Sequence, residues 1–150
     1  MLSAAVLVAT LVAHAQSKDP FVGTWKLNVA KSTYSPGPTP KAITSIYEAA
    51  GQGYKVVVTT ESATGTTQYA YTTNLDGKDA PVTGTSPNAD TLTITRIDAR
   101  TLQSVSKKGG KVTITQRNVL SVDGKTRTVT TTGNTPQGVK VNNFAIFERQ

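Results

Sequence analysis

The sequence of 150 residues contains no cysteine and only one histidine, His14. Without cysteine there is no disulfide framework, no thiolate metal site and no cysteine nucleophile. Because 37% of the residues are hydrophobic and only 17% are charged, the chain is neither plainly disordered nor membrane-spanning throughout. This length suits a single domain, which buries about two-thirds of its unfolded surface without covalent help.

Long apolar runs are also missing, except at the N-terminus, where residues 2–12 contain no charged side chain. That run has the length of a secretory signal segment and is too short for a stable bilayer anchor. Ala13 and Ala15 place small residues at both positions that signal peptidase recognises. We therefore expect residues 1–15 to be a signal peptide, residues 16–150 to form the domain, and the mature protein to be secreted or periplasmic, with Gln16 first. The alternative is a buried N-terminal strand or helix.

Cleavage after Ala15 removes the only histidine. A mature chain without histidine or cysteine can build neither a Ser-His-Asp or Cys-His site nor a histidine-ligated zinc or haem site. Carboxylates remain, but Asp76, Asp90, Asp98 and Asp123 stand where turns favour aspartate, and no spacing indicates a glycosidase pair. The sequence predicts no enzymatic activity, no cofactor and no metal site.

From Phe21 onward, no segment has the apolar spacing of a long amphipathic helix. Short alternating runs rich in Thr, Val, Ile and Tyr predict strands instead. The predicted strands cover residues 22–28, 42–49, 53–61, 66–75, 90–97, 101–108, 111–121, 126–132 and 139–148. Turn residues between them, such as Gly109-Gly110 and Asp123-Gly124, predict hairpins and therefore an antiparallel meander.

The segment Ser35–Pro40 interrupts this pattern with three prolines, which exclude a helix or a central strand. We expect it to be a stiff spacer that crosses one end of the sheet. About 8–10 antiparallel strands in one domain should close on themselves, because a flat sheet exposes its edges. The predicted fold class is all-β, an antiparallel up-and-down β-barrel without a helical lid, and a two-sheet sandwich is the alternative.

Residues Phe21-Val22-Gly23-Thr24-Trp25-Lys26-Leu27 resemble the opening strand of the lipocalin and fatty-acid-binding-protein (calycin) superfamily, and Phe144–Gln150 resembles its last strand. The pattern is also similar to small secreted bacterial proteins with a lipocalin-like domain. The resemblance implies that Gly23 and Trp25 close the bottom of the barrel. It further implies that an arginine packs across the tryptophan, with Arg149 as the candidate and Arg127 as the alternative.

The resemblance has two departures. Fatty-acid-binding proteins have a helix-turn-helix lid between their first two strands, and Asn28–Lys41 is too short and too broken by proline to form one. Their last strand holds the fatty-acid carboxylate with an Arg-x-Tyr pair, whose positions match Ala145 and Phe147 here. Capture of a carboxylate by that device is therefore not expected.

Strand alternation predicts which side chains point inward. Val112, Ile114, Gln116, Asn118 and Leu120 share one face, which predicts a partly polar interior. The candidate ligand-binding residues are Trp25, Tyr47, Tyr69, Tyr71 and Arg96. The alternative for the tyrosines is an ordinary structural role, in which the ring packs in the strand and the hydroxyl contacts water. Near the C-terminus the apolar residues change from odd positions, up to Val141, to even positions, from Phe144 on. A bulge near Asn142-Asn143 would place both sets on one face, and we expect one there.

The net charge of +7 is confined to the last third of the chain, because residues 96–150 hold ten basic and three acidic side chains. Adjacent hairpins can present these residues as one basic flank formed by Lys107, Lys108, Lys111, Arg117 and Arg127. Such a flank fits an anionic lipid or glycan surface, or it serves solubility alone. Nucleic acid is not expected, because no exposed aromatics accompany the basic residues.

These observations lead to two hypotheses. In the first, the protein is a secreted or periplasmic monomer that binds a small hydrophobic or amphipathic ligand within a lipocalin-like barrel. In the second, it is a filled, non-enzymatic structural or interaction module that contacts anionic envelope lipids or glycans through its basic flank. The volume inside the folded barrel distinguishes them.

Overall fold

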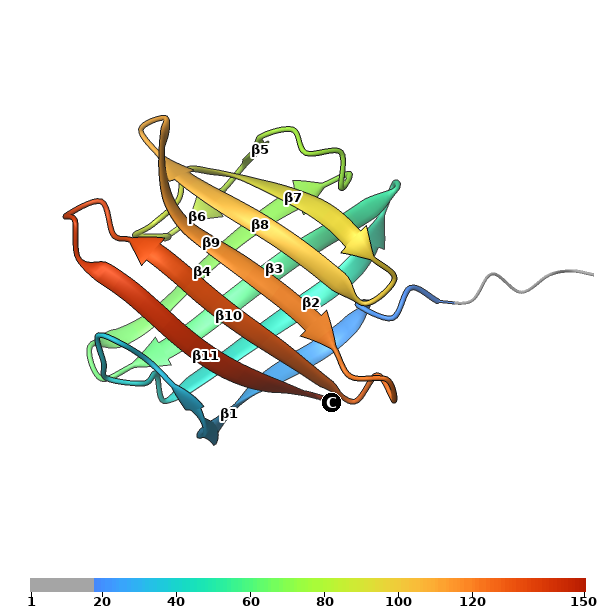
Figure 1. Ribbon diagram of the computed structural model, residues 1–150, viewed down its shortest axis with the longest axis horizontal. Coiled ribbons are helices and arrows are strands. Elements are labelled where there is room, and N and C mark those ends of the chain that lie inside the picture. The colour runs from blue at the N-terminus through green and yellow to red at the C-terminus, as the bar shows by residue number, and fades with distance from the viewer. Residues whose placement is uncertain (1–17) are drawn as a thin grey trace, which may run out of the picture.

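The computed structural model describes residues 18–150, and this part of the chain contains eleven antiparallel strands and no helix (Figure 1). The strands are β1 (Gly23–Thr33), β2 (Ala42–Ala50), β3 (Gly53–Ser62), β4 (Gly65–Thr73), β5 (Ala80–Pro81), β6 (Thr83–Gly84), β7 (Thr91–Asp98), β8 (Thr101–Lys108), β9 (Lys111–Leu120), β10 (Thr126–Asn134) and β11 (Lys140–Arg149). The predicted signal peptide, residues 1–15, lies outside the described residues. Within them, no helix is long and apolar enough to cross a membrane.

All eleven strands belong to one sheet, in the order β5-β7-β8-β9-β10-β11-β1-β2-β3-β4-β6. The long strands pair with their neighbours in the chain from β1 to β4 and from β7 to β11, and β1 pairs with β11, so the sheet curls into a nearly closed barrel. Figure 1 shows β7–β11 as one wall, with β2–β4 crossing behind it. The predicted all-β, up-and-down barrel is confirmed, and the nine predicted strands match β1–β4 and β7–β11.

The two shortest strands, which the sequence did not predict, complete the barrel wall. β4 and β7 do not pair with each other, and the segment Ala80–Gly84 lies between them. Its first half, β5, pairs with β7, and its second half, β6, pairs with β4. One extended segment therefore changes partner within five residues, and this seam replaces a direct ladder between β4 and β7.

Gly84 allows the seam to approach β4 closely. Its backbone has φ of +86°, and a Cβ at this position would lie 2.4 Å from the carbonyl oxygen of Gln68. Gly84→Ala should therefore lower the free energy of unfolding by about 1–3 kcal/mol. Chemical denaturation measures this loss. The matched control is Gly65→Ala, where φ is +136° but no atom lies within 4 Å of the new Cβ. Equal losses in the two variants would show that the close contact is unimportant.

One end of the barrel, which we call the closed end, is filled by large side chains. Trp25, Phe21, Tyr54, Leu102 and Leu120 are almost completely buried there. The chain enters this end through a local turn, in which Phe21 N–H donates to Asp19 Oδ1 at 3.0 Å. The indole Nε1–H of Trp25 donates to the Phe21 carbonyl oxygen at 2.9 Å, which holds the two rings together.

The predicted inward face of β9 is only partly correct. Ile114, Gln116 and Asn118 point inward, but Val112 is 61% exposed and Thr113 is buried. The reason is a register shift in the β8–β9 pairing, after Val105, which changes the face near the hairpin tip. Thr113 Oγ1 there donates to the Asn88 carbonyl oxygen at 2.6 Å.

The prediction of a bulge near Asn142-Asn143 is wrong. The β10–β11 register runs without interruption from Thr126 to Asn134. Every second residue of β11 from Val141 to Phe147 therefore points inward. Phe144 points outward instead and is 45% exposed. The irregularity lies across the pair, in β1, where the β1–β11 register shifts between Asn28 and Thr33. There the Ser32 hydroxyl oxygen accepts the N–H of Ile146 at 3.0 Å.

The proline-rich segment Ser35–Pro40 contains neither helix nor strand, as its prolines predict. It is tied to β11 by two hydrogen bonds: Asn142 N–H donates to the Ser35 carbonyl oxygen at 2.8 Å, and Ser35 N–H donates to Asn143 Oδ1 at 3.0 Å. The segment therefore lies at the end of the barrel opposite Trp25, where β11 begins.

Candidate ligand-binding cavity

The barrel is hollow beyond its closed end. A cavity of about 290 Å³ lies between the walls and reaches the end where the loops Tyr34–Pro40 and Thr85–Ala89 lie. Every long strand except β1 contributes inward side chains. The aliphatic and aromatic lining comprises Pro40, Ile43, Val58, Pro87, Ala89, Leu92, Ile114, Val129, Val141, Ala145 and Phe147, together with Tyr34, Tyr47, Tyr69 and Tyr71.

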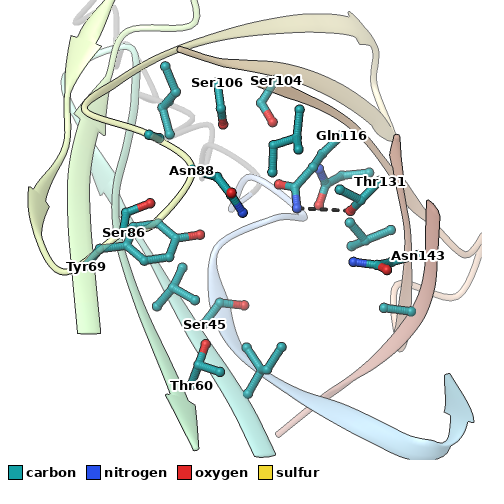
Figure 2. Close-up of a pocket in the computed structure, with 18 of the residues that line it drawn as sticks. Ser45, Thr60, Tyr69, Ser86, Asn88, Ser104, Ser106, Gln116, Thr131 and Asn143 are labelled. Atoms are coloured by element: carbon teal, nitrogen blue, oxygen red, sulfur yellow. Dashed lines mark hydrogen bonds between the residues drawn. The ribbon is translucent and has the colours of Figure 1, made fainter. Parts of the chain in front are cut away.

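Hydroxyl and amide groups make up the rest of the uncharged lining. They belong to Thr67, Thr85 and Asn118 and to the residues whose oxygen and nitrogen atoms Figure 2 shows facing the cavity from both walls: Ser45, Thr60, Ser86, Asn88, Ser104, Ser106, Gln116, Thr131 and Asn143. Gln116 Nε2 donates to Thr131 Oγ1 at 3.1 Å, which is the dashed line in Figure 2. Most of the other groups have no side-chain partner across the cavity, so the site offers many hydrogen-bonding groups to a molecule inside it.

Four tyrosines line the cavity, among them all three that the sequence singled out, Tyr47, Tyr69 and Tyr71. The rings of Tyr69 and Tyr71 stack with centroids 6.4 Å apart. Burial raises the pKa of Tyr34 and of Tyr69 to about 12 each, and it raises the pKa of Tyr71 well above its usual range. The phenols of these last three tyrosines therefore remain neutral hydrogen-bond donors at physiological pH.

These tyrosines predict a loss of stability at alkaline pH. In the unfolded chain tyrosine ionises near pH 10, whereas Tyr34 and Tyr69 retain their protons in the folded barrel until about pH 12. Their contribution to the free energy of unfolding is fully present below pH 10 and disappears as the pH rises toward about 12. Urea midpoints measured between pH 8 and pH 11.5 should fall across this range, and Tyr69→Phe should flatten the fall. Phenolate absorbance that appears near pH 10 in the folded protein and is lost in Tyr69→Phe would contradict the prediction.

Arg127 forms the deep end of the cavity and is 3% exposed. Its Nη1 donates to Tyr47 Oη at 2.8 Å and to Asn118 Oδ1 at 3.0 Å, and its Nη2 donates to Ser45 Oγ at 2.6 Å. The guanidinium carbon lies 4.6 Å from the centroid of the Phe147 ring. Arg127 does not belong to the predicted basic flank, because its side chain points into the barrel.

Two of the predicted ligand contacts, Trp25 and Arg96, do not line the cavity. Trp25 is fully buried beneath Arg127, whose guanidinium carbon lies 5.5 Å from the centroid of the indole ring. Arg96 lies at the closed end, where its Nη2 forms an ion pair with Asp19 Oδ2 at 2.7 Å and also donates to Tyr54 Oη.

Arg149 packs across the other side of the closed end, with its guanidinium carbon 4.2 Å from the centroid of the Trp25 ring. Its guanidinium donates to the backbone carbonyl oxygens of Val22, Gly124 and Pro20. A Cβ on Gly23 would lie 2.5 Å from Arg149 Nη1, so glycine at this position leaves the space that the guanidinium occupies. Gly23, Trp25 and Arg149 therefore form one contact set at the closed end.

The other members of the predicted basic flank differ in their surroundings. Lys107 Nζ pairs with Asp79 Oδ1 at 3.0 Å, and Lys108 Nζ donates to the Ser86 carbonyl oxygen at 3.2 Å. Both lysines thereby hold the connection between β4 and β7, part of which lines the cavity. Lys111 and Arg117 are exposed on the outside of β9.

The fold and the cavity define a hollow, single-domain antiparallel β-barrel. No protein-family model matches the chain, and no curated protein matches it. Among residues 18–150 no group of three or more His, Cys, Asp or Glu side chains is placed to hold a metal ion.

Proposed function

We propose that the mature protein, exported through its N-terminal segment, binds a small amphipathic molecule inside the barrel without transforming it. The observation that supports this proposal is the cavity of about 290 Å³, in which apolar side chains alternate with hydroxyl and amide groups. A purely structural barrel gains stability by filling this volume with apolar side chains, as the closed end does.

The volume limits the size of the ligand. An engineered apolar cavity of about 150 Å³ holds benzene, and sites for drug-sized ligands begin near 300 Å³. A cavity of about 290 Å³ therefore fits a molecule larger than benzene and smaller than a typical drug. The mixed lining favours a compact molecule that has both an aromatic or aliphatic body and polar groups.

The proposal is tested with 2-naphthoate and its uncharged analogue 2-naphthamide. We expect at least one of these probes to bind saturably, to raise the melting temperature and to change the fluorescence of Trp25, the only tryptophan. Hexadecanoate, which is too long for the cavity, serves as a size control.

A filling substitution locates the binding site. Ala145 is 3% exposed and lines the cavity, so Ala145→Phe should occupy part of its volume and abolish binding of the probe. Ile146→Phe is the matched control, because the next residue in β11 does not line the cavity. Thermal denaturation verifies that both variants fold. Binding that survives Ala145→Phe in a folded protein, or the absence of binding by both probes, would overturn the proposal.

A further inference from the structure

We propose that the molecule held in this cavity is an anion, and that its negative group lies on the guanidinium of Arg127. This inference rests on the binding function proposed above and specifies the charge of the ligand and where its charged group sits. It follows from the charge balance inside the barrel rather than from any sequence motif.

Arg127 is the only charged side chain among the described residues that line the cavity. A guanidinium is always protonated, so the interior holds a permanent positive charge. None of the ion pairs within residues 18–150 includes Arg127, and its hydrogen-bond partners Tyr47, Asn118 and Ser45 are all neutral. Burial of a cation without an opposite charge is strongly unfavourable, and an anion bound in the cavity removes that cost.

The two other arginines at the closed end have their charge or their donors satisfied within the protein. Arg96 has the carboxylate of Asp19 at 2.7 Å. Arg149 is partly exposed and donates to three backbone carbonyl oxygens. Arg127 is more buried than either of them, and neither a carboxylate nor solvent offsets its charge. This contrast within one structure separates Arg127 from the arginines that close the barrel.

The neutral partners of Arg127 do not use all of its donors. A guanidinium has five N–H donors, and Arg127 makes three hydrogen bonds to side chains. Its Nε is buried without any partner, the one such side-chain atom in the part of the chain that the structure describes. A carboxylate or similar oxyanion accepts a charge-assisted hydrogen bond from a guanidinium, and it also neutralises the charge that the neutral partners of Arg127 leave in place.

The surroundings of Arg127 favour an anion further. The rings of Phe147, Tyr47 and Trp25 lie 4.6, 5.0 and 5.5 Å from its guanidinium carbon, and they stabilise the cation without neutralising it. Because burial raises the pKa of Tyr69 and Tyr71, these phenols stay protonated and donate to an anion instead of competing with it. The polar walls favour a compact oxyanion over one with a long acyl chain.

Asn118→Asp gives the sharpest test, since it places a carboxylate of the same shape beside Arg127, where Asn118 Oδ1 now accepts at 3.0 Å. In the wild-type protein 2-naphthoate should bind about tenfold or more tightly than 2-naphthamide, because the carboxylate neutralises the buried guanidinium and the amide does not. In Asn118→Asp this advantage should disappear, because the new carboxylate pairs with the guanidinium and repels a second anion. The variant should also melt at a higher temperature, because its buried cation is paired.

Asn142→Asp is the matched control, because it changes the net charge equally on the exposed face of β11. It should leave the preference for 2-naphthoate unchanged. If wild-type protein binds 2-naphthamide as tightly as 2-naphthoate, Arg127 serves only the aromatic packing, and the anion proposal fails while the binding function stands. If neither probe binds, both proposals fail. If Asn118→Asp does not fold, the wild-type comparison decides, with the cation 2-naphthylmethylammonium as a third probe that should not bind.

Discussion

Trp25→Ala should lower the free energy of unfolding by about 3–5 kcal/mol, which is the range for removal of a fully buried aromatic side chain. The indole has no exposed surface and lies between two arginines, with the guanidinium carbons of Arg149 and Arg127 at 4.2 and 5.5 Å from its centroid. The variant also loses the hydrogen bond from Trp25 Nε1 to the Phe21 carbonyl oxygen. Urea denaturation followed by circular dichroism measures the loss, since the only tryptophan is then absent.

Trp25→Phe separates the contribution of the ring from that of the indole N–H. It keeps an aromatic face for Arg149 and should therefore lose less stability than Trp25→Ala. A loss below about 1 kcal/mol for the alanine variant would mean that the closed end does not depend on this side chain.

Phe21→Ala should have the second large effect and lower the free energy of unfolding by about 3–5 kcal/mol. Phe21 precedes the first strand, but its ring is fully buried and packs with Tyr47 and Tyr54 at centroid distances of 6.5 and 6.3 Å. Its removal leaves a hole beneath Trp25, so the emission of that tryptophan should shift to longer wavelength. Chemical denaturation and the emission spectrum measure the two effects.

Phe144→Ala is the control, because it makes the same chemical change at a side chain that is 45% exposed. Its loss should stay below about 1 kcal/mol. Equal losses at the two positions would contradict the role assigned to the segment before β1, namely that it fills the closed end.

The strands were predictable because alternation and turn chemistry are local signals. Each of the nine long strands follows a run of alternating residues between turns that contain glycine, proline or aspartate. The strands β5 and β6 have two residues each, too few to show a period, and they form only because β4 and β7 lie on either side. The orientation of Phe144 could not be predicted from alternation either, because β11 has apolar residues on both faces.

The site was predictable in part. Tyr47, Tyr69 and Tyr71 were found because aromatic residues at alternate positions favour an interior face. Arg127 is predicted on the basic flank and, as the alternative to Arg149, across Trp25; its guanidinium does lie over the Trp25 ring, but its side chain is buried and not on the flank. Its parity with Val129 and Thr131 was the available signal, since these three residues of β10 all line the cavity. Asn118 lies on the neighbouring strand β9, but Ser45 lies on β2, far away in the chain, and only the folded barrel shows that both bind the same guanidinium.

The most direct test of the account is whether a ligand enters the barrel, and the side-chain amide signals of ¹⁵N-labelled protein report this. Gln116, Asn118 and Asn143 line the cavity, whereas Asn142 and Gln137 are exposed outside it. Addition of 2-naphthoate should shift the NH₂ signals of the first three and leave those of the last two unchanged. Shifts confined to the exposed amides, or no shift with either 2-naphthoate or 2-naphthamide, would contradict binding within the barrel.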